Sequence, residues 1–217
     1  MTVPAQPGFV HVIDDDASWR TSMERLMSAA GYRVALYESA EQFLASAPGN
    51  APGCILLDMR MPGLTGLQLQ QRLVEMQRPL PIIFISGHGD IPSSVLAMKA
   101  GAEDFLTKPV GTDALLKAIT RAIARDREER ERIRQLDAMR SRVATLTPTE
   151  RKVFALVVRG MLNKQIAAEL GTAERTIKWH RQHIMQKLEI DSVAEMVSLA
   201  ERLDLMGTHK YPNVDSD

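Results

Sequence analysis

The sequence predicts an α/β fold in which a doubly wound, five-stranded parallel sheet is joined by a long helix to a small all-α domain of four helices. Short apolar runs alternate with amphipathic stretches as far as Thr112, strand signals then stop, and helical patterns continue to the end. With 217 residues, 45% of them apolar, the chain can build a core for each of two domains. A single cysteine, Cys54, excludes a disulfide framework and a multi-cysteine zinc site.

Apolar runs mark the expected strands of the first domain. They cover residues 9–13, 33–37, 54–58, 81–86 and 103–107, and amphipathic stretches lie near 17–30, 39–47, 65–77 and 91–100. The first, third and fourth runs are apolar throughout, which is typical of central strands buried on both faces. The second and fifth runs are more mixed, so we expect them nearer the edges of the sheet.

A long helix is expected over residues 114–143. Residues 125–134 of this helix are dense in charges of both signs, and an apolar stripe runs along its length. The helix is either a solvated linker or one whose stripe pairs with a second copy of itself, and the sequence leaves both open. The stripe consists of Leu115, Ile119, Ile123, Ile133, Leu136, Met139 and Val143.

The second domain opens with a helix start signal. Thr147 is a candidate N-cap, Pro148 occupies the first helical position and Glu150 completes a capping box. Three further helices fit residues 163–170, 173–188 and 192–204. The expected organisation is therefore a first domain at 1–112, a helical linker at 113–145, a second domain at 146–208 and a polar tail at 209–217.

Carboxylates follow two of the expected strands. Asp14, Asp15 and Asp16 come directly after the first strand, and Asp58 ends the third. The carboxyl ends of parallel strands line one crevice, so these side chains can converge there. Converging carboxylates repel one another unless a cation neutralises them, and a hard divalent ion such as Mg²⁺ suits oxygen ligands.

Two more strand ends add chemistry to the same edge. The fourth run ends at Ser86, whose hydroxyl can donate a hydrogen bond, and Lys108 follows the fifth run. A lysine ammonium is a point charge suited to a phosphoryl oxygen. The combination predicts that Asp58 accepts a phosphoryl group, while the metal and Lys108 balance the charge on the transferring oxygens.

The strings HVIDDD, LLDMRMPGLTGL, ISGHGDIP and AMKAGAEDFLTKP resemble the receiver domain of bacterial two-component response regulators over nearly all of residues 9–112. The resemblance implies a flavodoxin-like fold. One departure from the family pattern is Val110, which stands where an aromatic residue is common. It also implies these roles: Asp58 as the phosphorylated residue; Asp14, Asp15, Asp58 and the main-chain carbonyl of Arg60 as the metal pocket; Ser86 and Lys108 as phosphoryl-binding residues; Ser86 and Phe105 as switch residues.

A helix-turn-helix is expected where Gly171 permits a tight turn between two helices. On the second helix Lys178, Arg181, Gln182 and Met185 share a face with Trp179 and His183 alongside, while Ile177, Ile184 and Leu188 face inward. The total charge is zero, but residues 1–112 carry 8 basic and 11 acidic side chains, whereas 161–188 are locally basic. A basic, hydrogen-bonding helix face is typical of a recognition helix in a major groove.

Residues 146–203, beginning LTPTERKVF, resemble the LuxR-type helix-turn-helix. Trp179 faces the bases in that family's geometry, and contact with a thymine methyl group stays open. His180 is interpreted as structural or phosphate-facing rather than as a ligand or a catalyst. The resemblance directs Lys178, Trp179 and Gln182 toward base edges, and Lys164, Thr176, Arg181 and Lys187 toward phosphates.

The two resemblances together indicate a response regulator of the FixJ/NarL type, closest to the FixJ branch. They imply a cytoplasmic, non-enzymatic transcription regulator without membrane association. A sensor histidine kinase would phosphorylate Asp58 with Mg²⁺ as cofactor. The homodimer formed on phosphorylation would bind pseudo-palindromic double-stranded promoter DNA and act indirectly on RNA polymerase.

Two alternatives are weighed against this hypothesis. A phosphorylation-independent DNA-binding regulator would need no working pocket, yet all the pocket residues are present. An aspartyl-phosphate hydrolase of the haloacid-dehalogenase kind needs a second aspartate two residues after the first. This chain has Arg60 at that position, which argues against the hydrolase.

Overall fold

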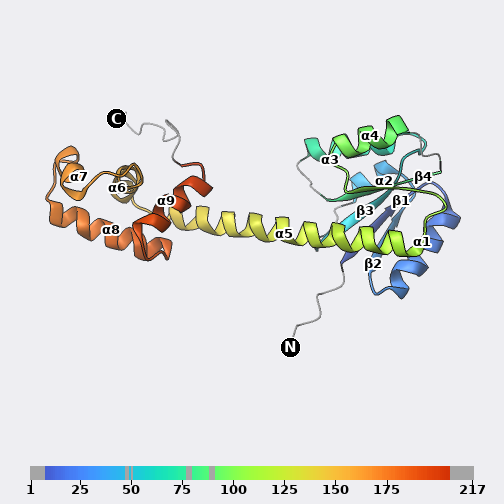
Figure 1. Cartoon of the computed structure of the whole chain (residues 1–217), viewed down its shortest axis with the longest axis horizontal. Coiled ribbons are helices and arrows are strands. Elements are labelled where there is room, and N and C mark those ends of the chain that lie inside the picture. The colour runs from blue at the N-terminus through green and yellow to red at the C-terminus, as the bar shows by residue number, and fades with distance from the viewer. Residues whose placement is uncertain (1–7, 47–48, 50, 77–79, 88–90, 206–217) are drawn as a thin grey trace. The chain divides into compact units, whose positions relative to one another are not determined.

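The computed structural model describes residues 8–46, 49, 51–76, 80–87 and 91–205. The chain forms two compact units, which divide within a long helix between Glu131 and Arg132 (Figure 1). The expected polar tail at 209–217 and the last residues of the expected second domain, 206–208, lie outside the described residues.

The first unit is built on a five-stranded parallel sheet with the order β2-β1-β3-β4-β5 among the described residues. Every residue of β3 and β4 is buried, while the edge strands β2 and β5 are half-buried along most of their length, which confirms the predicted central and edge positions. Because all the pairings are parallel, the carboxyl ends of the strands share one edge. The strands are β1 (Phe9–Ile13), β2 (Arg33–Tyr37), β3 (Gly53–Asp58), β4 (Ile82–Ser86) and β5 (Asp104–Thr107).

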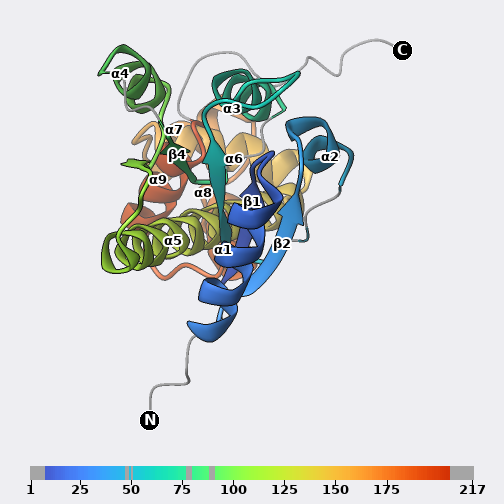
Figure 2. The same cartoon turned by 90° about the vertical axis from the view of Figure 1, so that its right-hand side faces the viewer.

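Helices cover both faces of this sheet (Figures 1 and 2). One face packs against α1 and the first part of α5, with Met27 and Ile119 in the shared core. The other face packs against α2, α3 and α4, with Phe43, Leu69 and Ala97 in its core. These helices are α1 (Ala17–Ala29), α2 (Ala40–Ala45), α3 (Gly66–Glu75), α4 (Ile91–Lys99) and α5 (Thr112–Ala144).

The long helix α5 contributes to the cores of both units. The stripe residues from Leu115 to Ile123 lie in the core of the first unit, and those from Leu136 to Val143 pack against the core of the second. Within the first unit, the buried Asp126 accepts a hydrogen bond from the Gly53 amide at 2.8 Å. The same carboxylate forms an ion pair with Arg130 at 2.7 Å. Of the predicted stripe, Ile133 alone is exposed, so the stripe serves mainly to pack this chain's own domains.

The second unit contains α6 (Pro148–Val158), α7 (Asn163–Glu169), α8 (Glu174–Leu188) and α9 (Val193–Arg202). The predicted capping box is present: the Thr147 hydroxyl accepts from the Glu150 amide at 3.3 Å, and the Glu150 carboxylate accepts from the Thr147 amide at 2.8 Å. Gly171 has a φ of +62° between α7 and α8, a conformation that glycine adopts without steric cost. The predicted helix-turn-helix arrangement is therefore confirmed.

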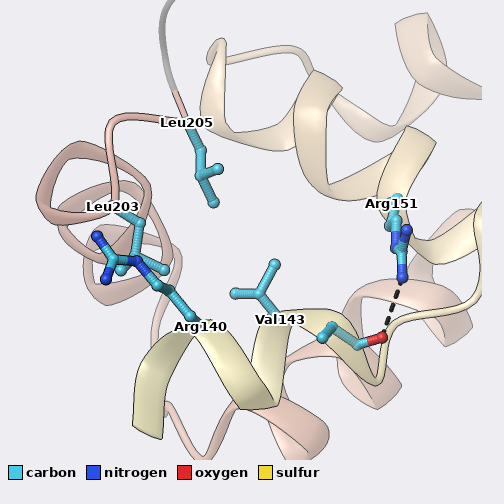
Figure 3. Close-up of a pocket in the computed structure, with 6 residues that line it drawn as sticks. Arg140, Val143, Arg151, Leu203 and Leu205 are labelled. Carbon is cyan, nitrogen blue, oxygen red and sulfur yellow. Dashed lines mark hydrogen bonds between the residues drawn. The ribbon is translucent and has the colours of Figure 1, made fainter. Parts of the chain in front are cut away.

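A shallow hollow of about 370 Å³ lies on the second unit between the end of α5, the start of α6 and the segment after α9 (Figure 3). Its polar side chains serve the fold. The Arg151 guanidinium donates to the Ala144 and Leu146 carbonyls, both at 3.0 Å, and so closes the end of α5. Arg140 pairs with Asp137 at 3.0 Å. The rest of the lining is Val143, Ala144, Leu203 and Leu205, none of which is a reactive side chain.

Candidate functional site

Three carboxylates meet at the carboxyl-terminal edge of the sheet. One oxygen each from Asp14, Asp15 and Asp58 lies within 4.8 Å of the others. The register of the sheet explains the meeting, because Ile13 pairs with Leu57 and the next residue on each strand is an aspartate. Asp14 is fully buried, Asp58 is nearly so and Asp15 is exposed, so the cluster is open to solvent on one side.

Asp16 does not belong to this cluster. Its carboxylate accepts from the Ser18 amide at 2.8 Å and the Trp19 amide at 3.2 Å, and it thereby caps the N-terminus of α1. The aspartate run therefore divides into two possible metal ligands and one helix cap.

Lys108 supplies the positive charge of the pocket. Its ammonium donates to Asp14 Oδ2 at 2.7 Å and to Asp58 Oδ2 at 2.9 Å. It also lies 4.5 Å from the centre of the Trp19 ring, a distance at which a cation and an aromatic face attract. The other Asp58 oxygen, Oδ1, accepts from the Arg60 amide at 2.9 Å. Both oxygens of Asp58 are therefore hydrogen-bonded. The peptide bond from Lys108 to Pro109, directly after the lysine, is cis.

The electrostatics of the pocket follow from burial and pairing. Burial raises the pKa of Asp14, and hydrogen bonds from Lys108 and from the Asp16 amide offset only part of that rise. Partial burial alone would lower the pKa of Lys108, but hydrogen bonds to Asp14 and Asp58 outweigh it and raise the pKa. Three carboxylates facing one ammonium leave an excess of negative charge, and their oxygens are the donor type that Mg²⁺ prefers.

The remaining residues predicted for this pocket lie on neighbouring strands. Ser86 is buried at the end of β4, beside the end of β3, and its carbonyl accepts from the Lys108 amide at 2.7 Å. Phe105 is half-buried on β5 and pairs in register with Phe84, with the ring centres 6.4 Å apart. The structure thus brings Asp14, Asp15, Asp58 and Lys108 together and places Ser86 at the same edge. Phe105 lies two residues further back, and the Arg60 carbonyl as a metal ligand stays a prediction.

The exposed face of α8 is rotated from the one that the sequence indicated. Ile177, Ile184 and Leu188 are fully buried and determine which side of the helix faces the core. Arg181 is half-buried and donates to Asn163 Oδ1 at 2.5 Å, and Met185 packs against the core. Glu174, the first residue of α8, is exposed, and the rest of the exposed face consists of Arg175, Lys178, Trp179, Gln182 and Gln186.

Sequence reasoning therefore missed two members of this face, Arg175 and Gln186. Placing residues opposite Ile177, Ile184 and Leu188 on a helical projection would have found them, because 100° of rotation per residue puts both beside Lys178 and Gln182. Arg181 reaches solvent only in part, because its side chain joins α8 to the start of α7.

The remaining predicted phosphate-facing residues differ in their surroundings. Lys164 is exposed and Thr176 is half-buried. Lys187 forms an ion pair with the buried Glu150 at 2.6 Å, and the same carboxylate completes the capping box of α6. Burial alone would raise the pKa of Glu150, but the hydrogen bonds from Lys187 and Thr147 outweigh burial and lower it. Lys187 therefore has a clear structural role.

Within the described part of the chain, no helix combines the length and the apolar character needed to cross a membrane.

Comparison with known proteins identifies the family of each unit. Residues 10–120 match the family model of the response regulator receiver domain, and residues 144–200 match that of the bacterial regulatory proteins of the luxR family. The chain therefore belongs to the two-component response regulators that carry a receiver and a LuxR-type DNA-binding domain, which confirms the resemblance found in the sequence.

Individual relatives cover almost the whole chain. Nodulation protein W of Bradyrhizobium diazoefficiens is 42% identical over 208 residues, which cover 96% of this chain and 92% of that protein. The transcriptional regulatory protein FixJ of the same organism is 41% identical over 199 residues, which cover 92% and 97%.

Solved structures give the same result. The response regulator StyR superposes with a TM-score of 0.81 at 44% identity, covering 91% of this chain and all of that one. Full-length FixJ from B. japonicum has a TM-score of 0.57 at 40% identity, covering 94% of this chain and all of that one.

Proposed function

We propose that this two-component regulator accepts a phosphoryl group on Asp58 from a sensor histidine kinase, and that the phosphorylated form dimerises and binds pseudo-palindromic promoter DNA. The effect of the regulator on RNA polymerase is then indirect. The regulator acts in the cytoplasm, where the promoter DNA lies. The observation that carries the proposal is the Lys108 ammonium, which bridges Asp14 and Asp58 inside a cluster of three carboxylates.

The chemistry follows from the groups present. An oxygen of the Asp58 carboxylate attacks phosphorus, a new P–O bond forms, and the P–N bond to the kinase histidine breaks, leaving the electron pair on the imidazole nitrogen. Lys108 stays beside Asp58 and balances charge on the transferring oxygens. Mg²⁺ held by Asp14, Asp15, Asp58 and the Arg60 main-chain carbonyl would supply further positive charge to these oxygens.

Phosphorylation would change the edge of the sheet that carries Asp58. The phosphoryl group adds a charge of about −1.5 to −2. The Ser86 hydroxyl, on the adjacent strand end, would donate to a phosphoryl oxygen, and Phe105 on the next strand would shift with it. Phe105 packs against the same core as Ala97 of α4, so this movement can change the surface of α4.

The surface of α4 supports dimerisation of the receiver. Its side chains Ile91, Val95, Leu96 and Met98 are all exposed, although they are large and apolar. Contiguous exposed apolar side chains on a water-soluble domain indicate an interaction surface. A second copy of the same face would cover them when phosphorylation alters the neighbouring strand.

A phosphotransfer experiment tests the first step. The full chain, incubated with Mg²⁺ and acetyl phosphate, should gain the mass of one phosphoryl group, and a chelator should prevent the gain. Asp58→Asn should gain none. Asp16→Asn is the matched control, because asparagine caps a helix as well as aspartate and Asp16 lies outside the carboxylate cluster.

Two results would count against the proposal. A mass gain that persists in Asp58→Asn would assign the phosphoryl group to another residue. Equal DNA affinity of the wild type and Asp58→Asn, both treated with the phosphodonor, would favour the phosphorylation-independent alternative.

A further inference from the structure

An ordered aromatic group projects from the DNA-facing side of α8. Trp179 is 53% exposed, yet its ring lies against His183 with centroids 3.8 Å apart and planes inclined by 32°. His180 approaches the indole edge-on, with centroids 5.0 Å apart. Covering this exposed apolar ring on binding a ligand would be favourable, so its ordered position on this face suits a contact with an apolar group.

His183 is itself held in one orientation. Its Nδ1 lies 2.9 Å from the Trp179 carbonyl oxygen. A carbonyl oxygen can only accept, so Nδ1 carries the proton and donates it. The imidazole is thus hydrogen-bonded to the helix backbone on one edge while its face packs against the indole. This arrangement restricts the indole before any ligand binds, which reduces the entropy lost on binding.

We infer that Trp179, positioned by His183, recognises the C5 methyl group of a thymine in each half-site of the DNA. The inference rests on the proposed DNA-binding function. The thymine methyl is the apolar group that base pairs present in the major groove, whereas the other distinguishing groups there are hydrogen-bond donors and acceptors. An indole carries a single hydrogen-bond donor, its Nε1–H, and the rest of its ring is apolar surface that can contact a methyl group.

The neighbours of Trp179 fit the same base-pair composition. Gln182 lies three residues further along α8, on the same exposed face, and a glutamine amide pairs with the N6 and N7 of adenine. Lys178, one residue before Trp179 and also exposed, suits the O6 and N7 of guanine. The expected half-site therefore contains a thymine and an adenine on neighbouring base pairs, with a guanine beside them.

The test separates the methyl contact from general binding. Phosphodonor-treated protein first selects its binding sequence from a random duplex library. The selected operator is then remade with deoxyuridine in place of thymine, one position at a time, which removes the methyl group and keeps every hydrogen-bonding group. In each half-site, replacing one particular thymine should lower the wild-type affinity about fourfold, which is the cost of losing one buried methyl group. Replacing that thymine in both half-sites should lower the affinity about 15-fold.

Variants assign this preference to residues. Trp179→Ala should bind the thymine and uracil operators equally, whereas Gln182→Ala, the matched control, should bind both more weakly and keep their ratio. His183→Ala should reduce the ratio, and His183→Phe, which can still stack, should restore it. A purely structural role of His183 would weaken both complexes alike and leave the ratio unchanged.

Each possible result decides the inference. Equal wild-type affinity for all the thymine and uracil operators overturns it, and so does a ratio that survives Trp179→Ala. If His183→Ala keeps the wild-type ratio of thymine-operator to uracil-operator affinity, the positioning role of His183 is overturned. If selection enriches no sequence at all, the proposed DNA-binding function fails and the inference fails with it.

Discussion

At the scale of single residues, adjacent aspartates take different roles because the chain turns at the end of β1. Asp14 points into the pocket, Asp15 stays exposed beside it, and Asp16 caps α1. Asp14 is the electrostatically unfavourable member. It is fully buried, its pKa is raised by that burial, and one lysine is shared between it and Asp58. Burying this carboxylate therefore costs stability, and the proposed phosphoryl transfer is the chemistry that it would serve.

Replacing Asp14 with asparagine should therefore stabilise the first unit when Mg²⁺ is absent. The raised pKa means that the folded state binds a proton more readily than the unfolded chain, so the ionised carboxylate opposes folding at neutral pH. Asp14→Asn should raise the free energy of unfolding at pH 7 by on the order of 1 kcal/mol. The gain should shrink as the pH falls through the raised pKa and Asp14 becomes protonated. Thermal unfolding at a series of pH values measures it.

Asp15→Asn provides the comparison, because Asp15 is an exposed member of the same cluster. It should weaken Mg²⁺ binding with little change in unfolding. Added Mg²⁺ should reduce the advantage of Asp14→Asn, since the ion stabilises the wild type. A gain that grows toward acid pH would show that burial of the Asp14 charge is not its cause.

At the scale of the element, α8 carries lysines with opposite roles. Lys178 is exposed and forms a loose ion pair with Glu174 at 3.6 Å, whereas Lys187 lies 2.6 Å from the buried Glu150 at the start of α6. Both belong to one basic pattern in the sequence. Their roles differ because the buried residues Ile177, Ile184 and Leu188 determine how the helix is rotated.

Methionine substitutions should separate the two lysines. Lys187→Met leaves the Glu150 carboxylate without its ammonium partner and should destabilise the second unit by about 1–2 kcal/mol, less than for a fully buried pair because solvent screens the lysine. Lys178→Met should change stability by less than about 0.5 kcal/mol. It should instead weaken DNA binding and lower the salt dependence by about one ion. Urea unfolding and DNA titration at several salt concentrations measure these effects.

The acid response checks the mechanism for Lys187. The pKa of Glu150 is lowered in the folded state, so the stabilisation is present above the unfolded pKa and is lost as the pH falls through the lowered value. Lys187→Met should flatten this part of the stability profile. An unchanged profile would mean that Lys187 does not cause the lowered pKa of Glu150.

At the scale of the whole molecule, a net charge of zero combines two different charge distributions. Residues 1–112 have an excess of acidic side chains, while exposed basic residues such as Lys164, Arg175 and Lys178 lie on α7 and α8. Few positive charges face DNA in one copy, so a single chain should bind weakly. Two copies held together would multiply the affinity, so the proposed dimerisation can act as a switch for DNA binding.

A charge placed on α4 should block this switch without disturbing phosphorylation. Leu96 is 57% exposed and lies outside the pocket, so Leu96→Asp should accept a phosphoryl group normally. Its phosphorylated form should stay monomeric in sedimentation and bind the operator about 100-fold more weakly than the wild type. Val74→Asp, an exposed apolar position on α3, is the matched control and should dimerise normally. A dimer of Leu96→Asp would place the interface elsewhere.

Much of this protein could be predicted from local sequence patterns. Apolar runs indicated the strands, turn and cap signals indicated the helices, and strand-end residues such as Asp58 and Lys108 indicated the pocket, because parallel strands bring their ends to one edge. The same patterns support membership of the response regulators. These features depend on residues close together in the chain or on a general rule of the fold.

Tertiary structure alone decided features that depend on packing between distant segments. The pairing of β1 with β3 brings Asp14 beside Asp58, while Asp16 caps α1 instead. The rotation of α8 exposes Arg175 and Gln186, turns Arg181 toward Asn163 and joins Lys187 to Glu150. The sequence by itself determined which elements form and which chemical groups they carry. The direction in which each side chain points followed from the cores, because burying apolar side chains leaves a helix or strand only one favourable orientation.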